Sequence, residues 1–227
     1  LWCHMKLTKS RRSLKPRERD TRLSSLRHAP QLIMITDQTR VPRVIESVQA
    51  LPKGSAVLFR DYELPCRLEA AKAVREVCLR RRLRFLVAGN GHLAAHLRAD
   101  GIHMPESGVE SARSWRRRRP EWFITVAAHS HKSLWRAARA GADAALLSPV
   151  FATVSHPDIT PMESLKFANL TFQSPLPVYA LGGINAKTAS RLFGTKLCGI
   201  AAVSGLGLSS AIPIGPKINY PPAFYST

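Results

Sequence analysis

The chain has 227 residues, 45% of them apolar, and it carries 34 lysines and arginines against 15 aspartates and glutamates, a formal net charge of +19. This apolar content is ordinary for a protein that buries a core, so a chain disordered throughout is excluded. No apolar run reaches the roughly 20 residues that a membrane-spanning helix needs, and we therefore expect a cytoplasmic protein with no membrane partner.

Short apolar runs alternate with longer amphipathic runs from Pro30 onward. The short runs predict strands at residues 32–36, 56–60, 84–88, 101–104, 122–128, 144–147, 178–181 and 199–203. The longer runs predict helices at residues 43–51, 65–82, 92–98, 110–118, 130–140, 162–172 and 186–193. Strands that are apolar on both faces indicate a parallel sheet covered by helices. Eight such units favour an α/β fold of the TIM (β/α)8 type, on the short side for that barrel. An open doubly wound sheet is the alternative, but no GxGxxG turn follows the first strand.

The two ends of the chain differ from this pattern. Residues 1–29 lack apolar periodicity and form a basic leader that we expect to be disordered. We assign residues 30–206 to the barrel domain. Residues 207–227 contain four prolines, which cannot be accommodated in one long helix, so we expect an irregular Pro/Gly-rich tail and an atypical last helix.

Positive charge is concentrated in clusters. Residues 1–30 hold nine lysines and arginines against Glu18 and Asp20, and further runs lie at residues 80–84 and 116–119. Such clusters are typical either of an anion-binding surface or of solvated helix faces. No aromatic residue interleaves with them as a base-stacking surface requires. We therefore expect no nucleic-acid partner, and a basic nucleic-acid-associated protein remains the alternative.

The four cysteines, at positions 3, 66, 78 and 198, form no CxxC pair and lie far apart in the sequence. This spacing predicts free thiols, and neither a disulfide framework nor a zinc site.

In a TIM barrel the active site lies at the carboxyl ends of the strands. The paired glycines Gly182 and Gly183 follow the seventh strand, and Ser204 and Gly205 follow the eighth. Paired glycines let the backbone approach a ligand closely. Two such turns after neighbouring strands predict a phosphate-binding cup, although tight turns without a ligand would have the same sequence.

Three further side chains end strands of the predicted barrel. His129 follows the fifth strand, where an imidazole could transfer protons near neutral pH or satisfy the start of a helix. Arg60 ends the second strand and is expected to hold an anion, because an inward guanidinium without one would be costly. His103 ends the fourth strand and either faces the mouth of the barrel or fills its top layer.

The chain resembles the thiamine phosphate synthase/TenI superfamily over about residues 32–206. The resemblance is carried by an ordered set of short motifs: Ile35-Thr36-Asp37, Arg60, Ala99-Asp100-Gly101-Ile102-His103, Ala128-His129-Ser130, Ala140-Gly141-Ala142-Asp143, Ser148-Pro149-Val150-Phe151-Ala152-Thr153, Ala180-Leu181-Gly182-Gly183-Ile184 and Ala202-Val203-Ser204-Gly205. It implies a TIM barrel and a place in thiamine biosynthesis. The synthases join hydroxymethylpyrimidine pyrophosphate to thiazole phosphate with Mg²⁺ and release pyrophosphate, whereas TenI-type members tautomerise the thiazole phosphate.

The resemblance also assigns site residues. The thiazole-phosphate half is preserved, with two hydroxyls, two glycines, and two amides of the last strand: Thr153, Ser155, Gly182, Gly183, Val203 and Ser204. The pyrophosphate half is not preserved. Where the family has two lysines, two metal-binding aspartates and a serine, this chain has Tyr62, His156, Gly89, Gly108 and Ala127. We count His156 and His103 with the substrate-binding residues.

The lost residues are those that a departing pyrophosphate needs, because cations and a metal ion stabilise its developing charge. Tautomerisation needs only a held phosphate and a general acid and base, and the histidine of the TenI-type enzymes falls on His129. We therefore favour a TenI-like reaction with His129 and Arg60 as catalytic residues, no metal site, and Mg²⁺ only if synthase activity is retained. Thiamine phosphate synthesis and a catalytically decayed phosphate-binding or regulatory barrel stay as alternatives. The resemblance also leaves room for a homo-oligomer.

Overall fold

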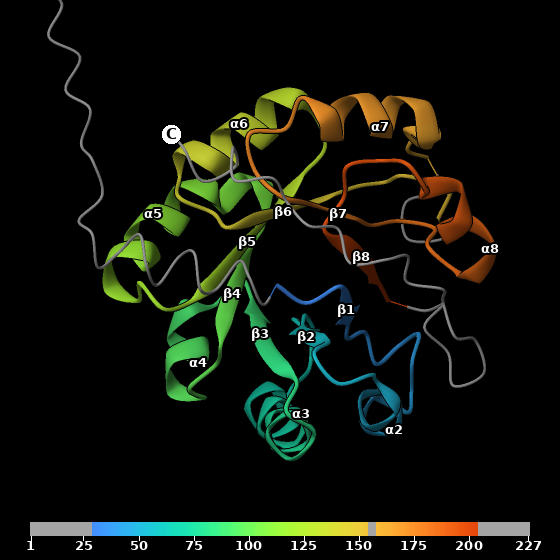
Figure 1. Cartoon of the computed structure of the whole chain (residues 1–227). Coiled ribbons are helices and arrows are strands. Elements are labelled where there is room, and N and C mark those ends of the chain that lie inside the picture. Colours follow the sequence, from blue (N-terminus) through green and yellow to red (C-terminus); the bar gives the residue numbers. More distant parts are fainter. Residues whose placement is uncertain (1–28, 154–157, 204–227) are drawn as a thin grey trace, which may run out of the picture.

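A computed structural model describes residues 29–153 and 158–203 (Figure 1). Eight parallel strands pair in chain order, and the last pairs with the first, so that the sheet closes into a barrel. The strands are β1 (Leu32–Ile35), β2 (Ala56–Phe59), β3 (Arg84–Ala88), β4 (Gly101–Met104), β5 (Phe123–Ala128), β6 (Ala144–Leu147), β7 (Val178–Ala180) and β8 (Gly199–Ala202). The predicted TIM barrel is confirmed.

Helices surround this barrel (Figure 1). They are α2 (Val44–Ala50), α3 (Arg67–Arg81), α4 (Gly91–His96), α5 (Val109–Arg118), α6 (His131–Arg139), α7 (Glu163–Phe172) and α8 (Ala186–Ala189), with short 3-10 turns η1 (Glu106–Gly108) and η2 (Ser190–Leu192). None of the described helices is long and apolar enough to cross a membrane.

One predicted helix is wrong in type. Residues 186–193 form four residues of α-helix and then the 3-10 turn η2, not one continuous helix. The start is well defined, because the Asn185 side chain accepts hydrogen bonds from the backbone of Lys187 and Thr188. The 3-10 turn then ends at Leu192, before Phe193 leaves the helical conformation and Gly194 takes a φ of +82°.

The assigned ends of the chain lie almost wholly outside the described residues. The basic leader is described only from Ala29, and the tail at residues 207–227 is not described. The domain boundaries therefore stay predictions. Of the four cysteines, the three that are described, Cys66, Cys78 and Cys198, form no disulfide with one another.

The strands are apolar on both faces because each face contacts a different part of the core. Along β1, Ile33 and Ile35 point into the barrel and pack with Leu58 and Leu86. The alternate residue Met34 belongs to the larger cluster between the barrel and the helices. This alternation follows from the two-residue period of a strand.

Closure of the barrel depends on the contact of β8 and β7 with the start of β1. Ile200 pairs with Leu32, and the backbone N–H of Ile200 donates to the Gln31 carbonyl at 3.0 Å. Gly199 permits this approach, since a Cβ there would lie 2.3 Å from the same carbonyl oxygen. The fully buried Tyr179 of β7 donates from its hydroxyl to the Pro30 carbonyl at 2.6 Å. These contacts join the two ends of the sheet.

Replacing Tyr179 by phenylalanine should lower the free energy of unfolding by about 1–2 kcal/mol, because the buried Pro30 carbonyl loses its donor. Urea denaturation measures the change. Tyr62→Phe is the matched control, because the Tyr62 side chain is 48% exposed and should lose at most a few tenths of a kcal/mol. Equal effects of the two substitutions would contradict a closing role for the Tyr179 hydroxyl.

Candidate functional site at the mouth of the barrel

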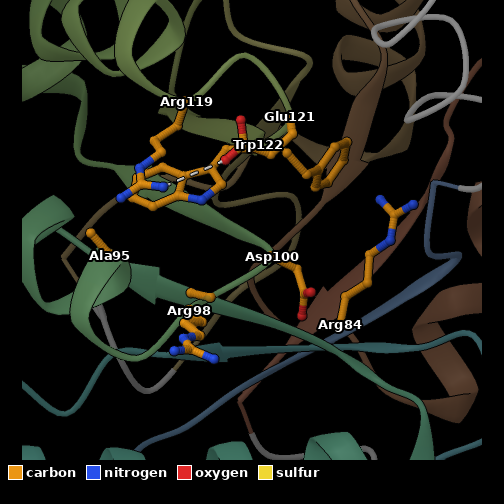
Figure 2. Close-up of a pocket in the computed structure, with 9 residues that line it drawn as sticks. Arg84, Ala95, Arg98, Asp100, Arg119, Glu121 and Trp122 are labelled. Carbon is orange, nitrogen blue, oxygen red and sulfur yellow. Dashed lines mark ion pairs between the residues drawn. The ribbon is translucent and has the colours of Figure 1, made fainter.

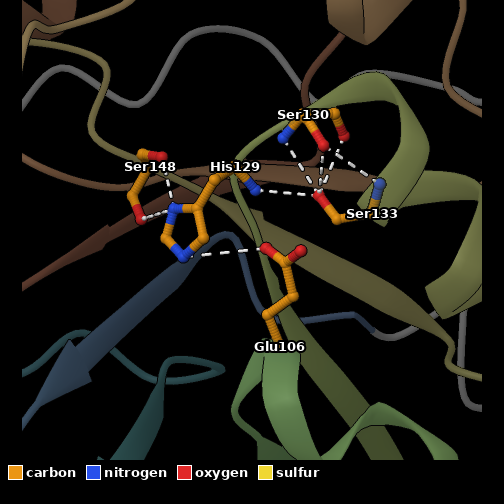
Figure 3. A network of polar contacts seen from close by, with 5 residues as sticks. All are labelled: Glu106, His129, Ser130, Ser133 and Ser148. Atoms are coloured by element: carbon orange, nitrogen blue, oxygen red, sulfur yellow. Dashed lines mark hydrogen bonds and ion pairs between the residues drawn. The ribbon is translucent and has the colours of Figure 1, made fainter.

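All eight strands run in the same direction, so the residues that follow them meet at one mouth. His129 directly follows β5, Ser148 directly follows β6, and Glu106 lies in the turn η1 after β4. Figure 3 shows these three side chains turned toward one another above the strand ends. They form one polar group at the mouth.

The contacts of His129 define its proton positions. Its Nδ1 lies 2.7 Å from the Ser148 carbonyl oxygen, which can only accept, so Nδ1 carries the hydrogen. In the neutral ring, Nε2 is then the basic nitrogen, and it lies 4.0 Å from Glu106 Oε2 (Figure 3). The His129 side chain is 53% exposed and the Glu106 side chain 33%. The ring is thus oriented and accessible to a ligand.

The backbone below His129 is held by the start of α6. Ser130 is the N-cap, and its side chain accepts from the Ser133 amide in a reciprocal capping box. The His129 amide donates to Ser133 Oγ at 2.9 Å (Figure 3). The helix start that was the alternative reading of His129 is therefore present, but the imidazole itself takes no part in the cap.

Arg60 is already paired with an acid. Its guanidinium lies 2.9 Å from Asp37 Oδ2, and Arg40 Nε lies 3.3 Å from the same oxygen. Burial by itself would raise the pKa of Asp37, but the Thr39 hydroxyl and the charges of Arg40 and Arg60 outweigh it and hold that pKa below its usual range. Because Asp37 balances its charge, Arg60 does not need an anionic ligand, contrary to the reason given from the sequence.

His103 is buried below the mouth, with 8% of its surface exposed. Its Nδ1 lies 3.0 Å from the hydroxyl oxygen of Thr125 on the neighbouring strand. Burial, and secondarily the positive charge of Arg60, lower the pKa of His103 to about 4. Of the two roles left open by the sequence, the geometry corresponds to a neutral ring in the top layer of the barrel.

The glycine turn after β7 packs against the loop after β6. Gly182 and Gly183 have φ values of +93° and +67°. A Cβ on Gly182 would lie 2.8 Å from Pro149 Cα, and one on Gly183 would lie 2.5 Å from the Ala152 carbonyl oxygen. Both glycines are required by this close approach, which places the turn beside Thr153.

The remaining residues of the predicted phosphate cup are only partly described. Val203 directly follows β8 at the same mouth. Ser155, His156 and Ser204 lie outside the described residues, so their assignment as substrate-binding residues stays a prediction.

On the side of the mouth formed by the loops after β2 and β3, the side chain of Tyr62 covers the position where the resemblance expects a metal-binding aspartate. The Tyr62 ring lies over Gly89, so that a Cβ added to Gly89 would be 3.2 Å from Tyr62 Cε1. The Arg67 guanidinium stacks 5.2 Å from the centre of the Tyr62 ring and donates to the Ala88 carbonyl. Neither Gly89 nor Gly108 supplies a side-chain ligand. No group of three His, Cys, Asp or Glu side chains within residues 29–153 and 158–203 could hold a metal ion.

Glu106 is the site residue that sequence reasoning missed. It lies two residues beyond the end of β4, so the same rule that identified His129 after β5 could have found it. A lone glutamate in a Pro-Glu-Ser-Gly stretch has no motif around it, and only its approach to His129 across the mouth distinguishes it.

The barrel and its mouth define the class of protein: an α/β barrel with a glycine turn after β7 and with a histidine and a glutamate near each other at the strand ends. Residues 32–206 match the thiamine monophosphate synthase family. The chain therefore belongs to this family, whose members serve thiamine biosynthesis.

Individual relatives agree with this assignment. The thiamine-phosphate synthase of Methanoculleus marisnigri is 30% identical over 184 residues, covering 77% of this chain and 86% of the relative. The synthase of Lysinibacillus sphaericus is 30% identical over 186 residues, covering 81% and 84%. Among solved structures, the thiamine phosphate pyrophosphorylase from Pyrococcus furiosus superposes with a TM-score of 0.68 and 26% identity, covering 79% of this chain and 88% of that one.

The buried His103 should make stability depend on pH. Below the ordinary pKa of about 6.5 the unfolded chain takes up a proton that the folded ring refuses until about pH 4. The free energy of unfolding should therefore fall as the pH drops through this window, by up to about 3 kcal/mol from this group. Urea titrations at pH 7 and pH 4.5 should show a smaller fall for His103→Asn than for the wild type. The exposed His96→Asn serves as control, and an unchanged fall in His103→Asn would contradict the assignment.

Proposed function

We propose that the chain binds thiazole phosphate at the mouth of the barrel and tautomerises it in a TenI-like reaction. The observation that carries the proposal is the pairing of His129 with Glu106, in which the Ser148 carbonyl holds the imidazole with Nε2 free to accept a proton.

The reaction needs one proton removed from the thiazole phosphate and one returned at a different atom, with no net change in charge or oxidation state. Nε2 of His129 accepts the proton, and the C–H electron pair moves into the conjugated ring system. The imidazolium that forms keeps its Nδ1–H bond to the Ser148 carbonyl, and the carboxylate of Glu106 offsets its positive charge. The same Nε2–H then protonates the new position, which completes the tautomerisation.

The loop after β7 supports binding of the phosphate group. Two consecutive glycines with positive φ leave the backbone open at the mouth, and Thr153 comes from the loop packed against them. Backbone N–H groups in such turns are good ligands for phosphate oxygens. This arrangement would keep the thiazole ring on the side of the mouth where His129 stands.

Thiamine phosphate synthesis is the second candidate, because the relatives bear the name of that activity. Against it stands the pyrophosphate half of the mouth, where Tyr62 covers Gly89 and no described carboxylate cluster is available for a metal ion. Pyrophosphate departure without such charge stabilisation would be slow. A decayed barrel that binds the phosphate without turnover is the third candidate.

Replacing His129 by alanine should lower the tautomerisation rate by about 10²–10⁴-fold, the usual contribution of a general base. Glu106→Gln should lower it by roughly tenfold, because the imidazolium that forms loses the neighbouring carboxylate charge, 4.0 Å away in the structure. Exchange of the thiazole protons with deuterium, followed by NMR, measures the rate. The affinity for thiazole phosphate should change little, and the neighbouring exposed His131→Ala should behave as the wild type. Undiminished exchange in folded His129→Ala would remove this residue from the mechanism.

A product assay separates the three candidates. The protein is mixed with hydroxymethylpyrimidine pyrophosphate, thiazole phosphate and Mg²⁺, and thiamine phosphate is detected after oxidation to its fluorescent form. We expect no product and measurable proton exchange. Formation of thiamine phosphate would establish the synthase instead, and bound thiazole phosphate with neither activity would establish the decayed barrel.

A further inference from the structure

A cavity of about 610 Å³ lies at the opposite end of the barrel from the mouth. Its lining comes from the amino-terminal ends of three neighbouring strands and from the segment after α4 (Figure 2). Arg84 begins β3, Asp100 precedes β4, and Phe123 begins β5, so this pocket shares no residue with the site described above. The proposed tautomerisation leaves it without a role.

Three arginines line this cavity: Arg84, Arg98 and Arg119. Figure 2 shows Arg84 and Arg98 on either side of Asp100, with Arg119 on a third side. Arg98 and Arg119 follow helices α4 and α5, where positive charge is favourable to the helix dipole. That explanation does not extend to Arg84, which lies at the start of a strand.

The acidic groups of the cavity are already neutralised. Asp100 Oδ2 lies 2.8 Å from Arg75 and also accepts the Phe85 amide. Glu121 lies 3.9 Å from Arg119. Within residues 29–153 and 158–203, Arg84 and Arg98 have no carboxylate within ion-pair distance. The pocket therefore has an excess of positive charge, and the guanidinium N–H groups of Arg84 and Arg98 are available to a ligand.

Two of the three guanidinium groups are also held in place. Arg84 lies over the Phe123 ring at 5.4 Å from its centre, and Arg119 lies over the Trp122 ring at 5.7 Å. Stacking of this kind orients a guanidinium while leaving its N–H groups available for oxygen ligands. Donors that are already oriented lose less entropy on binding than flexible ones.

From this geometry we propose that the base of the barrel is a second anion site, which takes a compound bearing a polyphosphate group. Guanidinium groups on either side of Asp100 (Figure 2) suit a ligand whose charges are themselves spread over two or more linked phosphates better than a single orthophosphate. Arg–phosphate pairs are commonly bidentate, which suits the fork of each group. The volume also leaves room for an organic part beside the phosphates.

Inorganic pyrophosphate, without a divalent metal, is the probe for the test. The full chain is labelled with ¹⁵N-tryptophan, and the indole N–H resonances of Trp122 and Trp135 are followed during titration. We expect a saturable shift of the Trp122 resonance with little change at Trp135, which lies on α6. Orthophosphate should bind at least several-fold more weakly. Absence of a Trp122 shift in the wild type would overturn the proposal.

Matched variants distinguish a built site from diffuse charge. The double variant Arg84→Gln/Arg98→Gln should weaken pyrophosphate binding, as reported by the Trp122 resonance, by roughly tenfold or more. Both guanidinium groups that have no carboxylate partner are then lost. Arg117→Gln/Lys132→Gln removes the same charge from exposed residues outside the cavity and should change it less than about twofold. If both double variants weaken pyrophosphate binding equally, the proposal of a discrete site is wrong. It is also wrong if an oligonucleotide displaces pyrophosphate and both double variants weaken that displacement to the same extent.

Arg98→Gln alone keeps the test informative if the double variant fails to fold, since Arg98 is exposed and has no described side-chain partner. It should weaken pyrophosphate binding several-fold. An unchanged affinity in this variant would contradict the proposed role of Arg98.

Discussion

Closure of the barrel is the constraint on which the rest of this structure depends. Parallel strands have their carboxyl ends at one edge, but only the pairing of β8 with β1 bends that edge into a ring. The contact requires a glycine at position 199 and is reinforced by the bond from Tyr179 to Pro30. Once the ring is closed, loops that are distant in sequence share one mouth.

The two ends of the ring carry charge in different ways. At the mouth, Arg60 and Arg40 both pair with Asp37, and His129 lies near Glu106. At the base, the arginines exceed the acids that could neutralise them. Part of this asymmetry follows from the fold, because helices in a barrel end at the base and basic residues stabilise helix carboxyl ends. The positive charge of the described residues is therefore not spread evenly between the two ends of the barrel.

The mouth is also divided into two halves. Toward β5, β6 and β7 it keeps a glycine turn and an oriented histidine, which are the parts that a phosphate and a proton transfer need. Toward β2 and β3, a tyrosine stacked on Arg67 occupies the space above Gly89. A barrel supports such divergence easily, because each loop changes without disturbing the strands below it. Family membership and the chemistry of the site are thus separate questions for this chain.

The sequence by itself determined the eight-unit barrel, because strands that are buried on both faces show continuous apolar runs, as residues 84–88 do. It also determined that His129 and the glycine pair follow strands, whereas His103 lies within β4, one residue before its end. Only the tertiary structure decided what these residues contact, since their partners lie far away along the chain. Arg60 meets Asp37, His129 meets Glu106 and the Ser148 carbonyl, and His103 is enclosed with Thr125. The change from α-helix to 3-10 turn after Ala189 was missed because the residues up to Phe193 fit one longer helix. Periodicity records burial along one element, whereas charge pairing and burial depth depend on contacts between elements.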